Sequence, residues 1–280
     1  KIILKHFGLK IRHSDLNHWQ ERVVDKVLYP KHKTTIAVVG KYIELQDAYK
    51  SIYEALRHGG IANDCLVEIK KIDSESIEVE GSQKMLSGVS GVLVPGGFGY
   101  RGIEGKIKAI QYARENNQPF FGICLGMQCA AIEFARNCLG IKRANSTEFV
   151  KRAKEPVISL LEEQRKVQQM GATMRLGEYP CRLLKGTLAY QAYGKADIYE
   201  RHRHRYEFNN RYRAALVKKG MVFSGIYPKK NLVEILELKG HPWFVGVQFH
   251  PEFQSKPDKA HPLFAEFIQA SMLFAARRGA

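Results

Sequence analysis

The sequence predicts an α/β protein with a mostly parallel sheet, helices on both faces and added antiparallel strands. Short, continuous apolar runs alternate with amphipathic stretches from Thr35 to about Leu139, which is typical of parallel strands buried on both faces by helices. The second half holds shorter strand candidates without intervening helical stretches, which favours antiparallel additions to the same sheet. With 280 residues and 45% hydrophobic content, the chain can bury a large core.

The apolar runs predict strands, and the amphipathic stretches predict helices. In chain order we expect strands at 36–39, 66–69, 91–94 and 120–123, and helices at 48–58, 103–116 and 127–139. Gly59 and Gly60 are expected to end the first of these helices. Beyond a charged, weakly periodic stretch at 151–179, we expect strands at 203–208, 222–226, 232–238 and 243–249.

The first 33 residues are polar and basic and precede the first apolar run. They contain one candidate helix, capped by Ser14 and stopped by Pro30. We interpret residues 1–33 as a linker segment and residues 34–280 as the folded domain.

The charge balance is strongly basic, with 44 Lys and Arg against 28 Asp and Glu and a net charge of +16. Such an excess raises the expectation of a polyanionic partner. The basic residues are spread along the chain, however, and no nucleic-acid-binding motif accompanies them. We therefore expect no nucleic acid partner.

Composition also bears on the cellular compartment. No run approaches the ~20 apolar residues of a membrane span, and the basic start lacks the apolar segment of a secretory signal. The five cysteines are odd in number and show no zinc-binding spacing, which fits a reducing compartment. We expect a cytoplasmic protein without membrane contact, structural disulfides or a metal site.

A cysteine stands between two glycines where a predicted strand turns into a helix, in Gly122-Ile123-Cys124-Leu125-Gly126. This pattern is typical of a nucleophile elbow, which exposes the side chain at the carboxyl end of the sheet. The helix dipole there favours a thiolate, and the free N–H groups can receive an oxyanion. The alternative for Cys124 is a buried, unreactive thiol, which is the role expected of Cys129 and Cys138.

A thiolate nucleophile needs a base that a third group orients. The predicted strand 243–249 ends at His250, Pro251 stops it, and Glu252 follows. The carboxyl end of a strand places His250 on the same edge of the sheet as the elbow. Cys124, His250 and Glu252 are therefore the predicted catalytic triad.

The segment at 97–102 matches G-x-G-x-x-G. No acidic residue follows about twenty positions later, and the segment does not open a first βαβ unit, so dinucleotide binding is not expected. The loop at 95–99 fits better as a second source of oxyanion N–H donors.

Arginine and histidine alternate at positions 201–205. On a strand the two histidines would share one face and the three arginines the other. One arginine could bind a carboxylate or phosphate, and a solvated strand face is the alternative.

Seven segments together resemble the class I glutamine amidotransferase domain of CTP synthases: GKYIELQDAY, VPGGFGYRG, GICLGMQ, NSTEF, TMRLG, ERHRHRYE and GVQFHPEF. The likeness covers roughly residues 35–267. The elbow and the HPE sequence alone would indicate only the wider amidotransferase superfamily. The remaining segments, in this order, are specific to CTP synthases.

The resemblance implies a flavodoxin-like fold and hydrolysis of L-glutamine through a thioester on Cys124. His250, oriented by Glu252, would protonate the departing ammonia. The N–H groups of Gly97 and Leu125 would form the oxyanion hole.

The resemblance also implies the residues that bind glutamine: Gly97, Phe98, Leu125, Gln128, Glu148 and Arg205. Glu148 would meet the α-amino group, and Arg205 and the Gln128 region would meet the α-carboxylate. Met174 and Arg175 would belong to an allosteric lid for GTP, in which Ala172 stands where the family usually has a second glycine.

Further implications concern a partner. An amino-terminal synthetase domain, not expected within this chain, would use ATP and magnesium to aminate UTP to CTP, with GTP as effector, in a homotetramer. Residues 1–33 would be the interdomain linker, and the glutaminase step itself would need no cofactor. Two alternatives stay open: a stand-alone amidotransferase subunit of another synthase, and a non-catalytic basic binding module.

Overall fold

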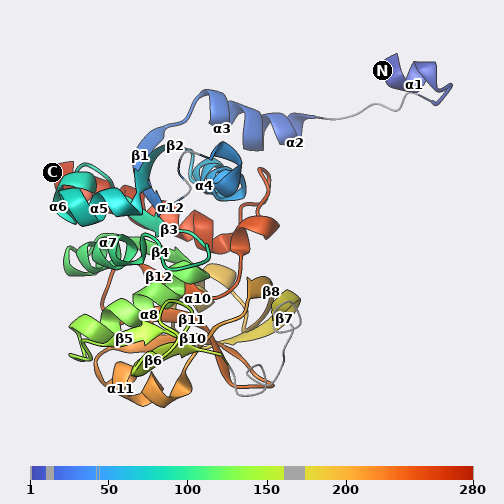
Figure 1. Ribbon diagram of the computed structural model, residues 1–280. Helices are drawn as coiled ribbons and strands as arrows, with labels where there is room; N and C mark the ends of the chain where they lie inside the picture. Colours follow the sequence, from blue (N-terminus) through green and yellow to red (C-terminus); the bar gives the residue numbers. More distant parts are fainter. Residues whose placement is uncertain (1, 11–15, 42, 44, 161–173, 280) are drawn as a thin grey trace.

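The computed structural model describes residues 2–10, 16–41, 43, 45–160 and 174–279 (Figure 1). Nine strands form one sheet in the order β2-β1-β3-β4-β12-β11-β10-β7-β8. Their bounds are β1 His32–Gly40, β2 Cys65–Asp73, β3 Gly91–Val94, β4 Phe120–Ile123, β7 Arg175–Leu183, β8 Asp197–His204, β10 Met221–Tyr227, β11 Leu232–Leu238 and β12 Phe244–Val247.

The sheet has a parallel part and an antiparallel part. Strands β2, β1, β3, β4 and β12 pair in parallel, and their order is that of flavodoxin-like folds. Strands β11, β10, β7 and β8 continue the sheet through antiparallel pairs. A second sheet has the order β5-β6-β9, with bounds Ala144–Ser146, Glu155–Ser159 and Glu207–Phe208. The predicted fold class is confirmed.

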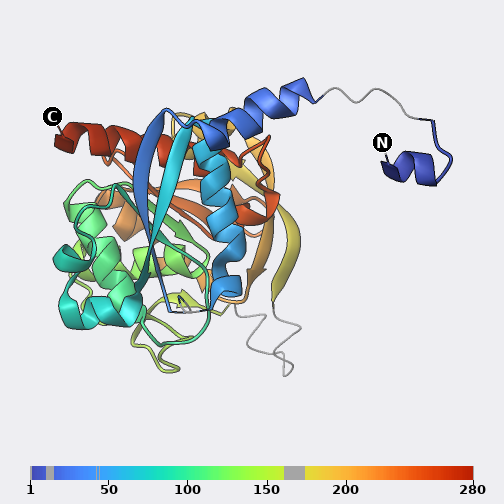
Figure 2. The ribbon, with the colours of Figure 1, turned by 90° about the horizontal axis from the view of Figure 1, so that it is seen from above.

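Helices cover both faces of the large sheet (Figure 2). One face carries α5 Ser74–Glu80, α7 Ile103–Glu115 and α8 Leu125–Asn137, and the other carries α4 Lys50–Ala62 and α12 Pro262–Gly279. Because side chains alternate along a strand, Phe120 and Phe121 of β4 enter different cores. A parallel sheet buried on both sides explains the continuous apolar runs of the sequence.

The remaining helices are short: α1 Ile2–His6, α2 Asn17–Trp19, η1 Gln20–Val24, α3 Asp25–Leu28, η2 Gln46–Tyr49, α6 Ser82–Met85, α10 Leu188–Tyr193, η4 Asn210–Tyr212, α11 Arg213–Lys218 and η5 Pro251–Gln254. In the part of the chain that is described, no helix has the length and apolar character needed to cross a membrane.

The predicted end of the first amphipathic helix is wrong. Helix α4 continues through Gly59 and Gly60 to Ala62. A Cβ on Gly59 would lie 2.8 Å from the carbonyl oxygen of Phe264, and one on Gly60 would lie 2.5 Å from that of Cys65. The two glycines therefore allow close packing on α12 and β2 rather than ending the helix.

The predicted strand at 203–208 is divided in the structure. Strand β8 ends at His204, and β9 begins at Glu207 in the other sheet. His202 and His204 are buried on one face of β8, as expected. Arg205 follows the end of the strand, so the expected single face of three arginines is wrong.

The segment interpreted as a linker is helical from Asn17 to Leu28, before Pro30. The proposed cap, Ser14, lies outside the described residues. Strand β1 begins at His32 and pairs with β2, so the last two residues of the 1–33 segment join the sheet. The linker role of this segment stays a prediction.

Candidate active site

Cys124 lies at the junction of β4 and α8 and has φ +52° and ψ −100°. This backbone conformation is costly for a residue with a Cβ. A Cβ on Gly122 would lie 2.8 Å from the main-chain carbon of Gly126, and a Cβ on Gly126 would lie 2.1 Å from the carbonyl oxygen of Val94. Only glycines allow this approach, which explains why the cysteine stands between two of them.

The predicted triad comes together at one edge of the sheet. Strand β12 pairs in parallel with β4, so the residues that follow both strands meet. His250 and Cys124 line the same hollow and interact electrostatically, and Nδ1 of His250 lies 2.7 Å from Oε1 of Glu252. The N–H of His250 donates to the carbonyl of Arg201 at 2.8 Å, which fixes the main chain.

The charge of His250 follows from these neighbours. Burial by itself would lower the pKa of His250, but Cys124 and Glu252 outweigh it and raise the pKa to about 10. An imidazolium can then lie between the sulfur and the carboxylate. With Nδ1 held by Glu252, the other ring nitrogen is left for proton transfer.

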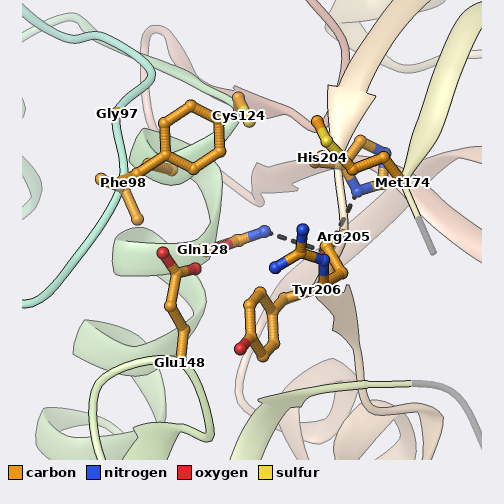
Figure 3. A pocket seen from close by; sticks show the side chains of 10 residues that line it. Gly97, Phe98, Cys124, Gln128, Glu148, Met174, His204, Arg205 and Tyr206 are labelled. Carbon is orange, nitrogen blue, oxygen red and sulfur yellow. Dashed lines mark hydrogen bonds between the residues drawn. The ribbon is translucent and has the colours of Figure 1, made fainter. Parts of the chain in front are cut away.

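Cys124 borders a pocket whose lining residues are Gly97, Phe98, Cys124, Leu125, Gln128, Glu148, Met174, His204, Arg205 and Tyr206 (Figure 3). All six residues predicted to bind glutamine line it. Figure 3 shows Glu148 and Arg205 on opposite sides of the pocket, with Gln128 between them. A carboxylate and a guanidinium placed in this way suit the two charged groups of a free amino acid.

The loop between β3 and α7 carries the predicted oxyanion donor, Gly97. The Lys41 ammonium donates to the carbonyl of Phe98 at 2.6 Å, and the N–H of Gly99 donates to Glu148 Oε1 at 2.9 Å. A Cβ on Gly97 would lie 3.4 Å from the side chain of Leu125, so the two predicted oxyanion residues are neighbours. Lys41 was not predicted from the sequence, although it directly follows β1 at the same edge of the sheet.

The charge of Glu148 depends on burial and on its neighbours. Burial raises the pKa of Glu148, while the Gly99 N–H and the charges of Arg205 and Lys41 oppose this rise. A positive group brought into the pocket would favour the ionised carboxylate further.

A second hollow also borders Cys124, and it shares Gly97 and Phe98 with the first pocket. Its lining residues are Ala48, Tyr49, Ser51, Ile52, Pro95, Gly96, Gly97, Phe98, Cys124, Arg203, His250, Glu252 and Phe253. A Cβ on Gly96 would lie 2.9 Å from Cε1 of His250, so this loop packs tightly on the triad.

The two residues predicted for a GTP lid have different surroundings. Met174 lines the amino-acid pocket. The guanidinium of Arg175 is buried, with Nη1 3.2 Å from Glu207 Oε1 and Nη2 2.8 Å from Glu234 Oε1. Burial raises the pKa of Glu207 to about 8 and that of Glu234 to about 7, against the opposing charge of Arg175. The neighbouring predicted lid residues, 171–173, lie outside the described residues, and the GTP role stays a prediction.

Within the described ranges, no cluster of three or more His, Cys, Asp or Glu side chains suits a metal ion. All five cysteines are free thiols. Burial raises the pKa of Cys129 to about 12, which agrees with the unreactive role expected of it.

The chain matches a known protein family and known protein sequences. The family "Glutamine amidotransferase class-I" matches residues 44–270. CTP synthase of Carboxydothermus hydrogenoformans is 58% identical over 97% of this chain and 50% of that protein. CTP synthase of Geotalea uraniireducens is 57% identical over 96% of this chain and 51% of that protein. The chain thus spans about half the length of these relatives.

Solved structures agree with this result. The glutaminase domain of Trypanosoma brucei CTPS, with bound acivicin, has a TM-score of 0.80 and 38% identity, covering 85% of this chain and 93% of that one. A GMP synthase subunit from Thermoplasma acidophilum, with a TM-score of 0.55 and 16% identity, covers 89% of this chain and 96% of that one and shares the fold alone. The chain therefore belongs to the class I glutamine amidotransferase family, as a glutaminase domain of the CTP synthase type.

Proposed function

We propose that this chain hydrolyses L-glutamine and supplies the ammonia to a synthetase domain that aminates UTP to CTP. The observation that carries the proposal is the Cys124, His250 and Glu252 triad beside a pocket with opposed Glu148 and Arg205 side chains. An amino acid held by its two charged groups would extend its side-chain amide toward the sulfur.

In the first half of the reaction, the Cys124 sulfur attacks the amide carbon of glutamine, and a C–S bond forms. The N–H groups of Gly97 and Leu125 stabilise the negative charge that develops on the carbonyl oxygen. The His250 imidazolium donates its proton to the amide nitrogen as the C–N bond breaks, and ammonia leaves. The raised pKa of His250 suits this acid role.

In the second half, His250 takes a proton from a water molecule, which attacks the thioester. The C–S bond breaks, its electron pair stays on sulfur, and glutamate is released. No cofactor takes part in either half. The second hollow also borders Cys124, and we propose it as the exit for ammonia.

The rest of the proposal concerns a second half of the protein, and it rests on relatives about twice as long as this chain. That half would bind ATP, magnesium and UTP, with residues 1–33 as the linker to it. The whole enzyme would be a cytoplasmic homotetramer that responds to GTP. A stand-alone subunit of another synthase is the alternative.

The test is to incubate the purified chain with glutamine and measure glutamate release, with Cys124→Ala as the control. We expect slow release by the chain and none by the variant. A glutamine analogue with an electrophile on its side chain should attach to Cys124 alone. Without glutamate release or an adduct on Cys124, the proposed glutaminase activity would be wrong. CTP formed from ammonia, ATP and UTP by this chain alone would refute the proposal that a separate synthetase domain aminates UTP.

A further inference from the structure

Gln248 is a fully buried polar residue whose side chain lies between those of Cys124 and Gln128. It directly follows β12, and its side-chain Nε2 lies 3.8 Å from the Cys124 sulfur. Its Oε1 lies 3.2 Å from Nε2 of Gln128. We propose that Gln248 is a further catalytic residue, whose amide donates a hydrogen bond to the Cys124 sulfur and stabilises the thiolate. The inference deepens the proposed glutaminase function and rests on it.

The orientation of the amide decides whether Gln248 stabilises or destabilises the Cys124 thiolate, because an amide oxygen facing a thiolate would repel it. The carbonyl of Tyr206 settles this direction, since a carbonyl can only accept. Nε2 of Gln128 donates to that carbonyl at 3.1 Å, so the same NH₂ group donates its second hydrogen to Oε1 of Gln248. Gln248 must then present its own NH₂ group to Cys124.

A second chain of hydrogen bonds holds the Tyr206 carbonyl in place. His204 Nδ1 lies 3.1 Å from that carbonyl, so this nitrogen carries the hydrogen. The other ring nitrogen of His204 then accepts from Nδ1 of His202 at 3.0 Å. Burial lowers the pKa of both histidines. Both rings therefore stay neutral, as this series of hydrogen bonds requires.

The main chain around Gln248 is also tied to the elbow. The N–H of Cys124 donates to the carbonyl of Val247 at 2.7 Å, and the N–H of Gln248 donates to the carbonyl of Glu234 at 2.8 Å. The amide and the sulfur therefore belong to one rigid unit. Preorganised donors of this kind stabilise developing charge without the cost of reorientation.

The chemistry gives Gln248 a role that His250 cannot fill alone. When water displaces the thioester, the electron pair of the C–S bond returns to sulfur. At that moment His250 has only just received its proton from water. An amide N–H already directed at the sulfur stabilises the leaving thiolate from the first instant.

The test compares variants by alkylation of Cys124 with iodoacetamide over a range of pH, and by glutaminase kcat and KM. Gln248→Met removes the donor and keeps a side chain of similar length. We expect alkylation at neutral pH to slow about tenfold, because a hydrogen bond to a charged group is worth roughly this factor. The midpoint of the alkylation profile should move to higher pH, and kcat should fall about tenfold with a smaller change in KM.

Gln248→Glu supplies a second measurement at constant side-chain size, and it also serves if the Met variant fails to fold. It places an oxygen against the sulfur and should move the alkylation midpoint further upward. The matched control is Gln118→Met, because Gln118 is equally buried and donates to the carbonyl of Val89, away from the sulfur. We expect the control variant to keep the wild-type profile.

Two outcomes would overturn the inference: an unchanged alkylation profile in a folded Gln248 variant, or an equal shift in Gln118→Met. The alkylation experiment tests Gln248 independently of the proposed function, because alkylation of Cys124 needs no glutamine. A chain without glutaminase activity whose profile still shifts in Gln248→Met would support the sulfur contact and refute the proposed function. An unchanged alkylation profile in a chain that hydrolyses glutamine would support the proposed function and refute the sulfur contact.

Discussion

Gly126 lies so close to Val94 that a Cβ on the glycine would come within 2.1 Å of the valine carbonyl oxygen. This approach presses the first turn of α8 onto the end of β3. The turn before it must then be tight, and Cys124 takes φ +52°. The strained backbone presents the sulfur to both the glutamine pocket and His250.

The strain at Cys124 predicts that removing its Cβ stabilises the fold. Cys124→Gly should unfold at higher denaturant than Cys124→Ala, with a free energy of unfolding larger by about 1 kcal/mol, because glycine accepts a positive φ without cost. Neither variant should hydrolyse glutamine. Urea unfolding of the two inactive variants measures the difference, and equal stabilities would show that the turn is not strained.

Much of the parallel half could be predicted from the sequence, because burial on both faces leaves continuous apolar runs. The bounds of β3 and β4 are those expected at 91–94 and 120–123. Strand β7 was missed, because it is only partly buried and carries charged residues and a proline in place of a continuous apolar run. Helix α12 was also absent from the predicted elements.

The triad could be predicted because its residues follow strands at one edge of the sheet, and each motif is local. Lys41 and Gln248 were missed for a different reason. Their roles depend on side chains that reach across the fold, to the carbonyl of Phe98 and to the Cys124 sulfur. Nothing in the local sequence of either residue indicates its partner.

Lys41 should affect turnover rather than the nucleophile. Lys41→Met removes the 2.6 Å hydrogen bond to the carbonyl of Phe98 and frees the loop that holds the Gly97 N–H. We expect kcat for glutamine to fall about tenfold, somewhat less than for loss of a whole oxyanion donor, with alkylation of Cys124 unchanged. Lys70→Met is the matched control, since Lys70 binds the carbonyl of Met85 away from the site. Similar kinetics in both variants would contradict the positioning role.

Arg175 should be needed for stability. Arg175→Met leaves Glu207 and Glu234 buried without their cation and should cost about 3 kcal/mol of unfolding free energy. Adding Glu234→Gln should recover part of this loss.

The control for Arg175 is Arg182→Met. Its ion pair with Asp197 is exposed, so the variant should lose less than about 1 kcal/mol. Thermal or urea unfolding of the three variants beside wild type decides the matter. A fully stable Arg175→Met protein would show that the guanidinium is not a structural group.

The triad predicts a pH dependence of stability. The pKa of His250 in the folded chain is about 10, above its ordinary value of 6.5. The imidazolium therefore contributes stability that is fully present below pH 6.5 and is lost as the pH rises through 10. The free energy of unfolding should fall more between pH 6.5 and pH 10 in wild type than in His250→Gln. Parallel curves for the two proteins would exclude a raised pKa.

Glu148 and Arg205 should act on glutamine binding, and the structure separates two roles of Glu148. Glu148→Gln keeps an oxygen that can accept from the Gly99 N–H but loses the charge that would meet the α-amino group. It should raise KM at least about tenfold, the scale of a lost charge-assisted hydrogen bond, with little change in kcat. Glu148→Ala releases the loop as well and should also lower kcat.

Arg205→Ala should resemble Glu148→Gln, because it removes the guanidinium proposed to meet the α-carboxylate. Alkylation of Cys124 should stay at the wild-type rate in all three variants, since thiolate formation depends on the elbow, His250 and Gln248, which these variants leave in place. Steady-state kinetics with glutamine, run beside the alkylation assay, makes the distinction. A lower alkylation rate with an unchanged KM in Glu148→Gln or Arg205→Ala would contradict this prediction. The substituted residue would then act on the nucleophile and would not bind a charged group of the substrate.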